Sequence, residues 1–96
     1  MTSSVPKAWQ GILWSRDVRQ LKWNEDKVYI IHQVLMYGSL DDIKRLFAHY
    51  GKSAVSRVFT SHPQKIYTPA AFNFIKTYLL GIHAALPQDR YVRRVY

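Results

Sequence analysis

The sequence contains no cysteine and only six acidic residues, and it has no long hydrophobic run. Without cysteine, disulfide bonds and thiolate metal sites are excluded. No apolar run approaches the ~20 residues that a membrane-spanning helix needs, and the first residues lack the pattern of a secretory signal. Neither a glycine-rich phosphate loop nor a nucleophile elbow is present. We therefore expect a soluble, cytoplasmic, non-enzymatic protein with no cofactor, metal or membrane partner.

The scarcity of acidic residues is confined to the second half of the chain. Lys and Arg number 14 against 6 Asp and Glu, which gives a net charge of +8. Residues 1–42 hold five basic and five acidic residues, whereas residues 43–96 hold nine basic residues and Asp89 as their single acid. Such asymmetry favours a polyanionic partner, usually nucleic acid. The alternative is a basic surface that only keeps the protein in solution.

Apolar spacing predicts an all-α fold. A chain of 96 residues forms one domain at most, and 48% hydrophobic residues are enough for a folded core. Stripes with a spacing of three to four residues predict helices over 25–37, 39–50 and 53–61, and a fourth that begins at Pro69 and stops near Gly81.

Residues with strong positional preferences mark the helix ends. Asn24 is the expected cap of the first helix, and Gly38 is expected to stop it in a left-handed conformation. Ser39 and Asp42 have the spacing of a capping box. Thr68 is expected to cap the fourth helix, whose first residue is a proline.

The segments outside the four helices differ in composition. Residues 1–23 are expected to form an irregular arm that wraps the helical domain of residues 24–82, with tryptophans as its anchors. Residues 83–96 form a basic tail that alternates like a strand and is expected to be a mobile arm or an edge strand offered to another chain. We expect these two segments to bind a partner through the following residues: Trp9, Trp14, Arg90, Tyr91, Arg93, Arg94 and Tyr96.

Helices 39–50 and 53–61 resemble a helix-turn-helix, with Gly51 at the turn. In that motif the second helix buries one face and offers a polar face to the major groove. Small hydroxyl residues allow close approach to DNA, and an arginine such as Arg57 can bind guanine with two hydrogen bonds. The helical hairpin can equally be a plain solvated surface. The candidate DNA-binding residues are Lys44, Arg45, Lys52, Ser53, Ser56, Arg57, Thr60 and Lys65.

One catalytic pattern is also present. Arg57 and His62 have the Arg-x4–6-His spacing of HEPN ribonucleases, in which arginine would bind the scissile phosphate and histidine would move a proton. Seven arginines and four histidines in so short a chain make one such match nearly expected by chance. The four histidines are not spaced as metal ligands. A HEPN-like ribonuclease is therefore the third hypothesis.

Residues 12–74 resemble a family of small prokaryotic antitoxin-like proteins. The motifs are "ILW" at 12–14, "WNEDKVYIIHQVLMYG" at 23–38, "LDDIKRLFAHYG" at 40–51 and "TPAAFNF" at 68–74. Genes of this type often stand beside a gene for a nucleotidyltransferase-like toxin. The resemblance implies an antitoxin that neutralises a partner toxin by direct binding, with possible autoregulation through DNA. The alternative is a stand-alone transcriptional regulator, and either form can be a homodimer.

Overall fold

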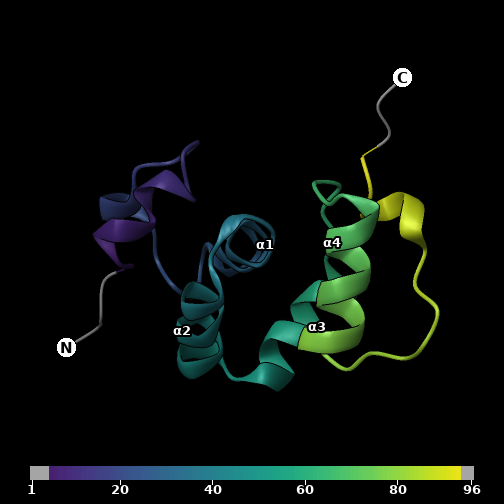
Figure 1. Ribbon diagram of the computed structural model, residues 1–96. Coiled ribbons are helices and arrows are strands. Elements are labelled where there is room, and N and C mark those ends of the chain that lie inside the picture. Colours follow the sequence, from purple (N-terminus) through teal and green to yellow (C-terminus); the bar gives the residue numbers. More distant parts are fainter. Residues whose placement is uncertain (1–4, 94–96) are drawn as a thin grey trace.

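The computed structural model describes residues 5–93 and confirms the all-α fold. Within this range there is no β-strand, only an isolated bridge between Tyr67 and Val92. The N-terminal arm lies on one side of α1 and helix α4 on the other (Figure 1). The helices are α1 (Lys27–Tyr37), α2 (Leu40–Tyr50), α3 (Lys52–Ser61) and α4 (Pro69–Phe74), and the short turns are η1 (Lys7–Gly11), η2 (Val18–Gln20), η3 (Ile75–Leu79) and η4 (Gln88–Arg90).

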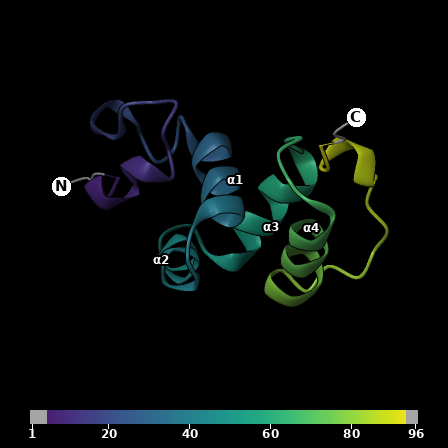
Figure 2. The ribbon, with the colours of Figure 1, turned by 45° about the horizontal axis from the view of Figure 1, so that its top comes forward.

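Helix α1 is the centre of the core. It packs against both α2 and α3, which also pack against each other, and it lies between the arm and α3 (Figure 2). Its residues Ile30, Ile31, Val34 and Leu35 are buried. The helix begins two residues later than predicted, so the expected cap at Asn24 is wrong. Residues 23–26 form a turn instead, in which the Asp26 amide donates to the Lys22 carbonyl at 2.9 Å.

The two glycines that follow α1 and α2 serve different purposes. Gly38 has φ −78° and ψ 161°, so the predicted left-handed conformation is wrong. A side chain at Gly38 would instead meet the Val34 carbonyl oxygen at 2.7 Å, which explains the glycine by close backbone approach. Gly51 has φ +87° and joins α2 directly to α3. The capping box of Ser39 and Asp42 at the start of α2 is confirmed.

The N-terminal arm is held on α2 by an aromatic cluster. Trp9 is buried, and its indole Nε1 donates to an Asp42 carboxylate oxygen at 3.0 Å. Trp23 stacks on His49 with ring centroids 3.7 Å apart, and its carbonyl accepts a 2.5 Å hydrogen bond from the Tyr50 hydroxyl. Burial raises the pKa of Tyr50, so that this hydroxyl keeps its proton. Over residues 5–23 the arm is therefore held against α2 by Trp9 and Trp23, whereas Trp14 is exposed.

A buried network joins α1 to the segment between α3 and α4. The His32 side chain is buried, with Nε2 2.7 Å from the His62 carbonyl oxygen and Nδ1 2.6 Å from the Tyr67 hydroxyl. A carbonyl oxygen only accepts, so Nε2 carries the proton and Nδ1 accepts from Tyr67. Both ring nitrogens are satisfied while the ring is neutral. Burial lowers the pKa of His32 to about 4.

Helix α4 begins as predicted, since the Thr68 hydroxyl accepts from the Ala71 amide and Pro69 is the first helical residue. The predicted continuous helix is wrong beyond Phe74, where the backbone widens into the π-helical turn η3. Gly81 then ends the helix with φ +64°.

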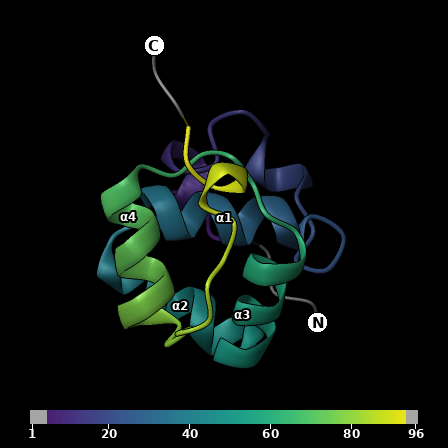
Figure 3. The same ribbon diagram turned by 90° about the vertical axis from the view of Figure 1, so that its right-hand side faces the viewer.

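The tail does not form a free arm over its described residues. The chain after η3 returns from the end of α4 towards its beginning (Figure 3). There the Tyr67 amide donates to the Tyr91 carbonyl at 2.8 Å and the Arg93 amide to the Tyr67 carbonyl at 3.1 Å. Tyr91 and Val92 are buried. The Tyr91 ring stacks on Phe59 with centroids 4.8 Å apart, so this part of the tail completes the core.

Candidate nucleic-acid interface

Helix α3 has one buried face and one polar face. Val55, Val58 and Phe59 are buried against the rest of the core. Residues three and four positions apart lie on the same side of a helix, so Ser53, Arg57 and the residues around them face away from that core. The face expected from the sequence is therefore the exposed face in the structure.

The predicted DNA-binding residues are nearly all accessible. Ser56 is half-buried, and the remaining seven are exposed: Lys44, Arg45, Lys52, Ser53, Arg57, Thr60 and Lys65. They come from α2, from α3 and from the bend that follows α3. The Thr60 hydroxyl already donates within α3, to the Ser56 and Arg57 carbonyls at 3.0 and 3.1 Å. Thr60 can therefore offer DNA only the acceptor capacity of its oxygen.

The turn between α2 and α3 is shorter than the helix-turn-helix pattern predicts. Gly51 alone separates the two helices, whereas the motif usually has a turn of about 3–4 residues. Gly51 makes this connection in a positive-φ conformation, with φ 87° and ψ 144°. The pair thus has the packing of two successive helices with an exposed second helix, but a tighter connection than the usual DNA-binding motif.

The ion pairs of the protein lie away from this face. Among residues 5–93, the pairs are Arg16–Asp26, Arg19–Asp17 and Lys22–Glu25, all within the arm and the start of α1. The basic side chains of α2 and α3 have no carboxylate within ion-pair distance in the same part of the chain. These side chains are therefore not held in ion pairs, although Arg45 lies close enough to Asp42 to contribute to the lowered pKa of that carboxyl group, and they are free to approach a phosphate backbone.

The residues predicted to bind a partner protein are dispersed. Trp9 and Tyr91 were expected at a partner surface, but both are core residues, because each indole or phenol ring packs among other aromatic rings. Trp14 is 56% exposed and contacts Tyr37 edge-to-face, with centroids 4.7 Å apart. The last four fall into two groups: Arg90 and Arg93 are exposed, and Arg94 and Tyr96 lie outside the described residues.

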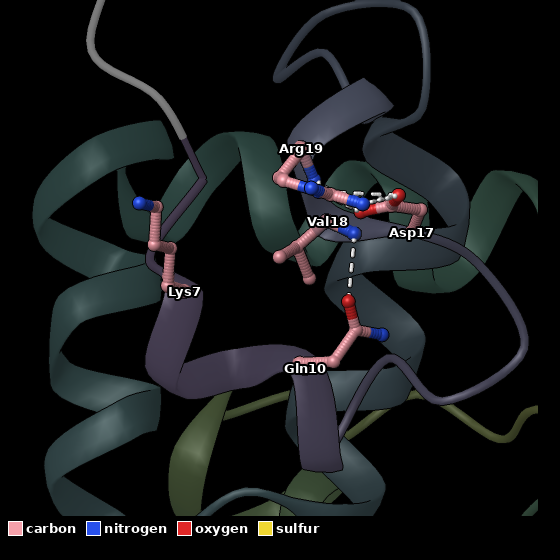
Figure 4. A pocket seen from close by; sticks show the side chains of 5 residues that line it. All are labelled: Lys7, Gln10, Asp17, Val18 and Arg19. Atoms are coloured by element: carbon pink, nitrogen blue, oxygen red, sulfur yellow. Dashed lines mark hydrogen bonds and ion pairs between the residues drawn. The ribbon is translucent and has the colours of Figure 1, made fainter.

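The arm contains a shallow pocket of about 370 Å³. It lies between the Lys7 side chain and the pair formed by Asp17 and Arg19 (Figure 4). The Asp17 carboxylate accepts from Arg19 at 2.8 Å, and this bond keeps the pKa of Asp17 below its usual value. Gln10 accepts from the Val18 amide at 3.0 Å. The side chains of Gln10, Asp17 and Arg19 are thus already hydrogen-bonded within the arm. Lys7 is the one charged group lining this pocket without such a partner, and a single lysine does not make a catalytic or metal site.

The arrangement around His62 differs from that of a helical Arg-His pair. Helix α3 ends at Ser61, so His62 lies beyond the helix that carries Arg57. Its carbonyl oxygen is occupied by His32. Among residues 5–93 no group of three or more His, Cys, Asp or Glu side chains is placed to hold a metal ion. Over the same range, every helix is too short or too polar to cross a bilayer.

Comparison with known proteins identifies the family. A family of unknown function (DUF6922) matches residues 10–59, which is more than half of the chain, and the chain therefore belongs to that family. The match includes three of the motifs quoted above, those at 12–14, 23–38 and 40–51, together with most of α3. No curated protein and no solved structure matches the chain. The antitoxin role consequently rests on the resemblance described from the sequence.

Proposed function

We propose that the protein is a non-enzymatic DNA-binding protein that contacts the duplex through the outer face of α3. The observation that supports this most directly is the exposed face of Ser53, Arg57 and Lys52, which is basic and rich in small hydroxyls. It lies opposite the buried residues of the same helix. Lysines and arginines on α2 and after α3 would contact phosphates and set the register, while Arg57 would reach base edges.

The test is a charge reversal on α3 with a matched reversal elsewhere. Binding to a fluorescent random-sequence duplex is measured by anisotropy, from about 50 to 200 mM salt. Arg57→Glu is expected to weaken binding at least about tenfold, because on a random-sequence duplex it removes a positive charge from the DNA-facing surface and places a carboxylate against the phosphates. The plot of log K against the logarithm of the salt concentration should also become less steep, by about one to two units of slope, since each phosphate contact contributes about 0.9.

The control is Lys27→Glu, at the exposed first residue of α1. It changes the net charge by the same amount, and a carboxylate is well tolerated at a helix N-terminus. If both variants lose affinity equally, binding depends on total charge and α3 is not the contact helix. If the wild-type protein binds no DNA at low salt, the proposal is wrong.

A second candidate function is that of an antitoxin that neutralises a nucleotidyltransferase-like toxin, as the resemblance implies. The exposed contact between Trp14 and Tyr37 favours it, because solvent-exposed aromatic pairs are typical of protein interfaces. The direct test is the growth of a culture that expresses the adjacent open reading frame, with and without this protein. Growth arrest that this protein does not relieve would contradict the antitoxin role.

A further inference from the structure

The described end of the tail has a fixed place beside the end of α3. The Tyr91 hydroxyl donates to the Phe59 carbonyl at 2.6 Å, in the last turn of α3. We call residues 62–68, which join α3 to α4, the link. In the link, Tyr67 forms two main-chain hydrogen bonds with the tail, one to Tyr91 and one to Arg93. The link and the tail therefore lie side by side (Figure 2 and Figure 3), and the fold sets where the side chains of the tail lie relative to α3.

Three exposed basic side chains belong to these two adjoining segments. They are Lys65 of the link, and Arg90 and Arg93 of the tail. Within residues 5–93, none of the three has a carboxylate at ion-pair distance. The two segments contain one acid, Asp89. Their combined charge is therefore positive, with one guanidinium group before and one after the two buried residues of the tail.

The acids that border the link from the turn before α1 already have basic partners. Glu25 and Asp26 line a shallow surface pocket together with Gln64 of the link. Glu25 lies 3.7 Å from the Lys22 ammonium, and Asp26 accepts a hydrogen bond from Arg16 at 3.3 Å. These two carboxylates are therefore matched by charges of the arm, and over the described residues neither forms an ion pair with the tail.

The surface of the link and the tail exposes charge without large apolar side chains. Over the described residues, the exposed large hydrophobic side chains all belong to other segments; they are Trp14, Tyr37, Leu40, Phe74 and Tyr78. A protein interface usually has an apolar core, and a membrane-bound surface inserts apolar side chains into the lipid. Contacts with a phosphate backbone require only charged or polar hydrogen-bond donors. The composition of this surface therefore favours nucleic acid over a protein or a membrane.

We infer that the tail makes a second contact with DNA, in which Arg90 and Arg93 each bind a backbone phosphate beside the end of α3. The inference rests on the proposed function, and it extends the contact surface from α3 through Lys65 to the tail. A guanidinium group can donate two parallel hydrogen bonds to a phosphate. Because Tyr91 is buried and bonded to α3, the main chain that carries both arginines is ordered before binding, which lowers the entropic cost of the contact.

The test is the double variant Arg90→Gln and Arg93→Gln, which removes two charges and keeps the buried residues and main-chain bonds of the tail. Binding to the same random-sequence duplex is measured by anisotropy from about 50 to 200 mM salt. The slope of log K against the logarithm of the salt concentration should fall by about two, since each phosphate contact contributes about 0.9. Affinity at about 50 mM salt should fall about tenfold, to the same extent for duplexes of different sequence.

The matched control is the double variant Lys7→Gln and Lys27→Gln, which removes two exposed charges from the arm and the start of α1. It should keep the slope and the affinity of the wild-type protein. Equal slopes for the tail variant and the wild type would overturn the inference. An equal loss of slope in the control would also overturn it, because total charge would then determine binding. The thermal unfolding midpoints of both double variants should match that of the wild type, which shows that the fold is intact.

Arg57→Glu, measured beside these variants, separates this inference from the proposed function. Binding that Arg57→Glu weakens and the tail variant does not would leave α3 as the contact helix and remove the tail from the interface. Binding that the tail variant alone weakens would keep the tail contact and contradict the proposal for α3. A wild-type protein that binds no duplex would overturn both. Arginine-dependent binding to phosphatidylserine vesicles that is tighter than binding to DNA would replace the nucleic acid with a membrane.

Discussion

At the scale of single residues, His32 is the polar group on which the core depends most. Its ring connects α1 to the His62 carbonyl and to the Tyr67 hydroxyl, and Tyr67 is itself buried. A protonated ring would have to donate from both nitrogens, so Tyr67 would have to turn its proton towards another acceptor. The His32 carbonyl oxygen, 3.5 Å from the Tyr67 hydroxyl, is the nearest one, and at that distance it accepts weakly.

This network predicts a loss of stability in mild acid. Burial holds the pKa of His32 at about 4 in the folded state, below the ordinary value of 6.5. The unfolded chain therefore binds the proton first, and the contribution of His32 is complete above pH 6.5 and is lost as the pH falls to 4. The difference between these two pKa values corresponds to a loss of about 3 kcal/mol in the free energy of unfolding. Urea unfolding at pH 7.5, 6.5, 5.5 and 4.5 measures it, since free energy of unfolding should fall through the series.

The control is His83→Gln, which removes an exposed histidine of the tail. The stability of this variant should fall with pH in the same way as that of the wild-type protein. Tyr67→Phe removes the donor to Nδ1 and should lower stability by about 1–3 kcal/mol at pH 7.5. A wild-type free energy that is flat from pH 7.5 to 5.5 would show that His32 is not a neutral, buried acceptor.

At the scale of elements, the structure depends on backbone geometry that only some residues permit. Gly51 has φ +87° and ψ 144°, a region that is nearly exclusive to glycine. A Cβ at Gly51 would meet nothing within 4 Å. Gly51→Ala therefore tests backbone strain alone and is expected to lower the free energy of unfolding by about 1–3 kcal/mol.

Gly11→Ala is its matched control, since a Cβ there also meets nothing and its φ is not positive. This control should leave stability within about 0.5 kcal/mol, as most exposed substitutions do. Urea unfolding of both variants and wild type gives the comparison. Equal stability for the two alanine variants would mean that α2 and α3 can be joined without the positive-φ conformation.

Sequence patterns predicted these elements where the signal is local. The capping box at Ser39, the Thr68 cap and the exposed face of α3 all follow from residues within one or two turns. The burial of Tyr91 depends on packing against Phe59 and Phe72, which are far from it in the chain, and periodicity does not report such contacts. The apolar spacing also does not mark the π-helical turn at Ile75. His32 was detectable in part, because it lies four residues after Val28 and three before Leu35, on the apolar side of α1.

At the scale of the whole molecule, the paired and unpaired charges lie in different regions. The ion pairs lie in the arm and at the start of α1, whereas the unpaired basic residues lie on α2, α3 and the tail. The exposed large apolar side chains come from the arm, from the ends of α1 and α2 that meet at Gly38, and from α4 with η3; they are Trp14, Tyr37, Leu40, Phe74 and Tyr78.

The tail contributes two buried residues to the core, Tyr91 and Val92. Tyr91 packs against Phe59 and Phe72 with ring centroids 4.8 and 4.9 Å away, and its hydroxyl donates to the Phe59 carbonyl at 2.6 Å. A chain that ends at Leu86 lacks Tyr91 and Val92. Loss of one large buried aromatic side chain costs about 3–5 kcal/mol, against a total stability of about 5–15 kcal/mol for a natural domain.

The shortened chain should therefore be mostly unfolded or only marginally stable, with a reduced thermal unfolding midpoint and weak near-ultraviolet circular dichroism. A chain that ends at Arg93 retains both buried residues and the hydrogen bonds of residues 91–93 to Tyr67, and it should unfold like the full-length protein. Equal midpoints for the two shortened chains would mean that the tail is a free arm after all. In that case its arginines, rather than its aromatic residues, would account for its presence, and DNA affinity would be the property that the truncation changes.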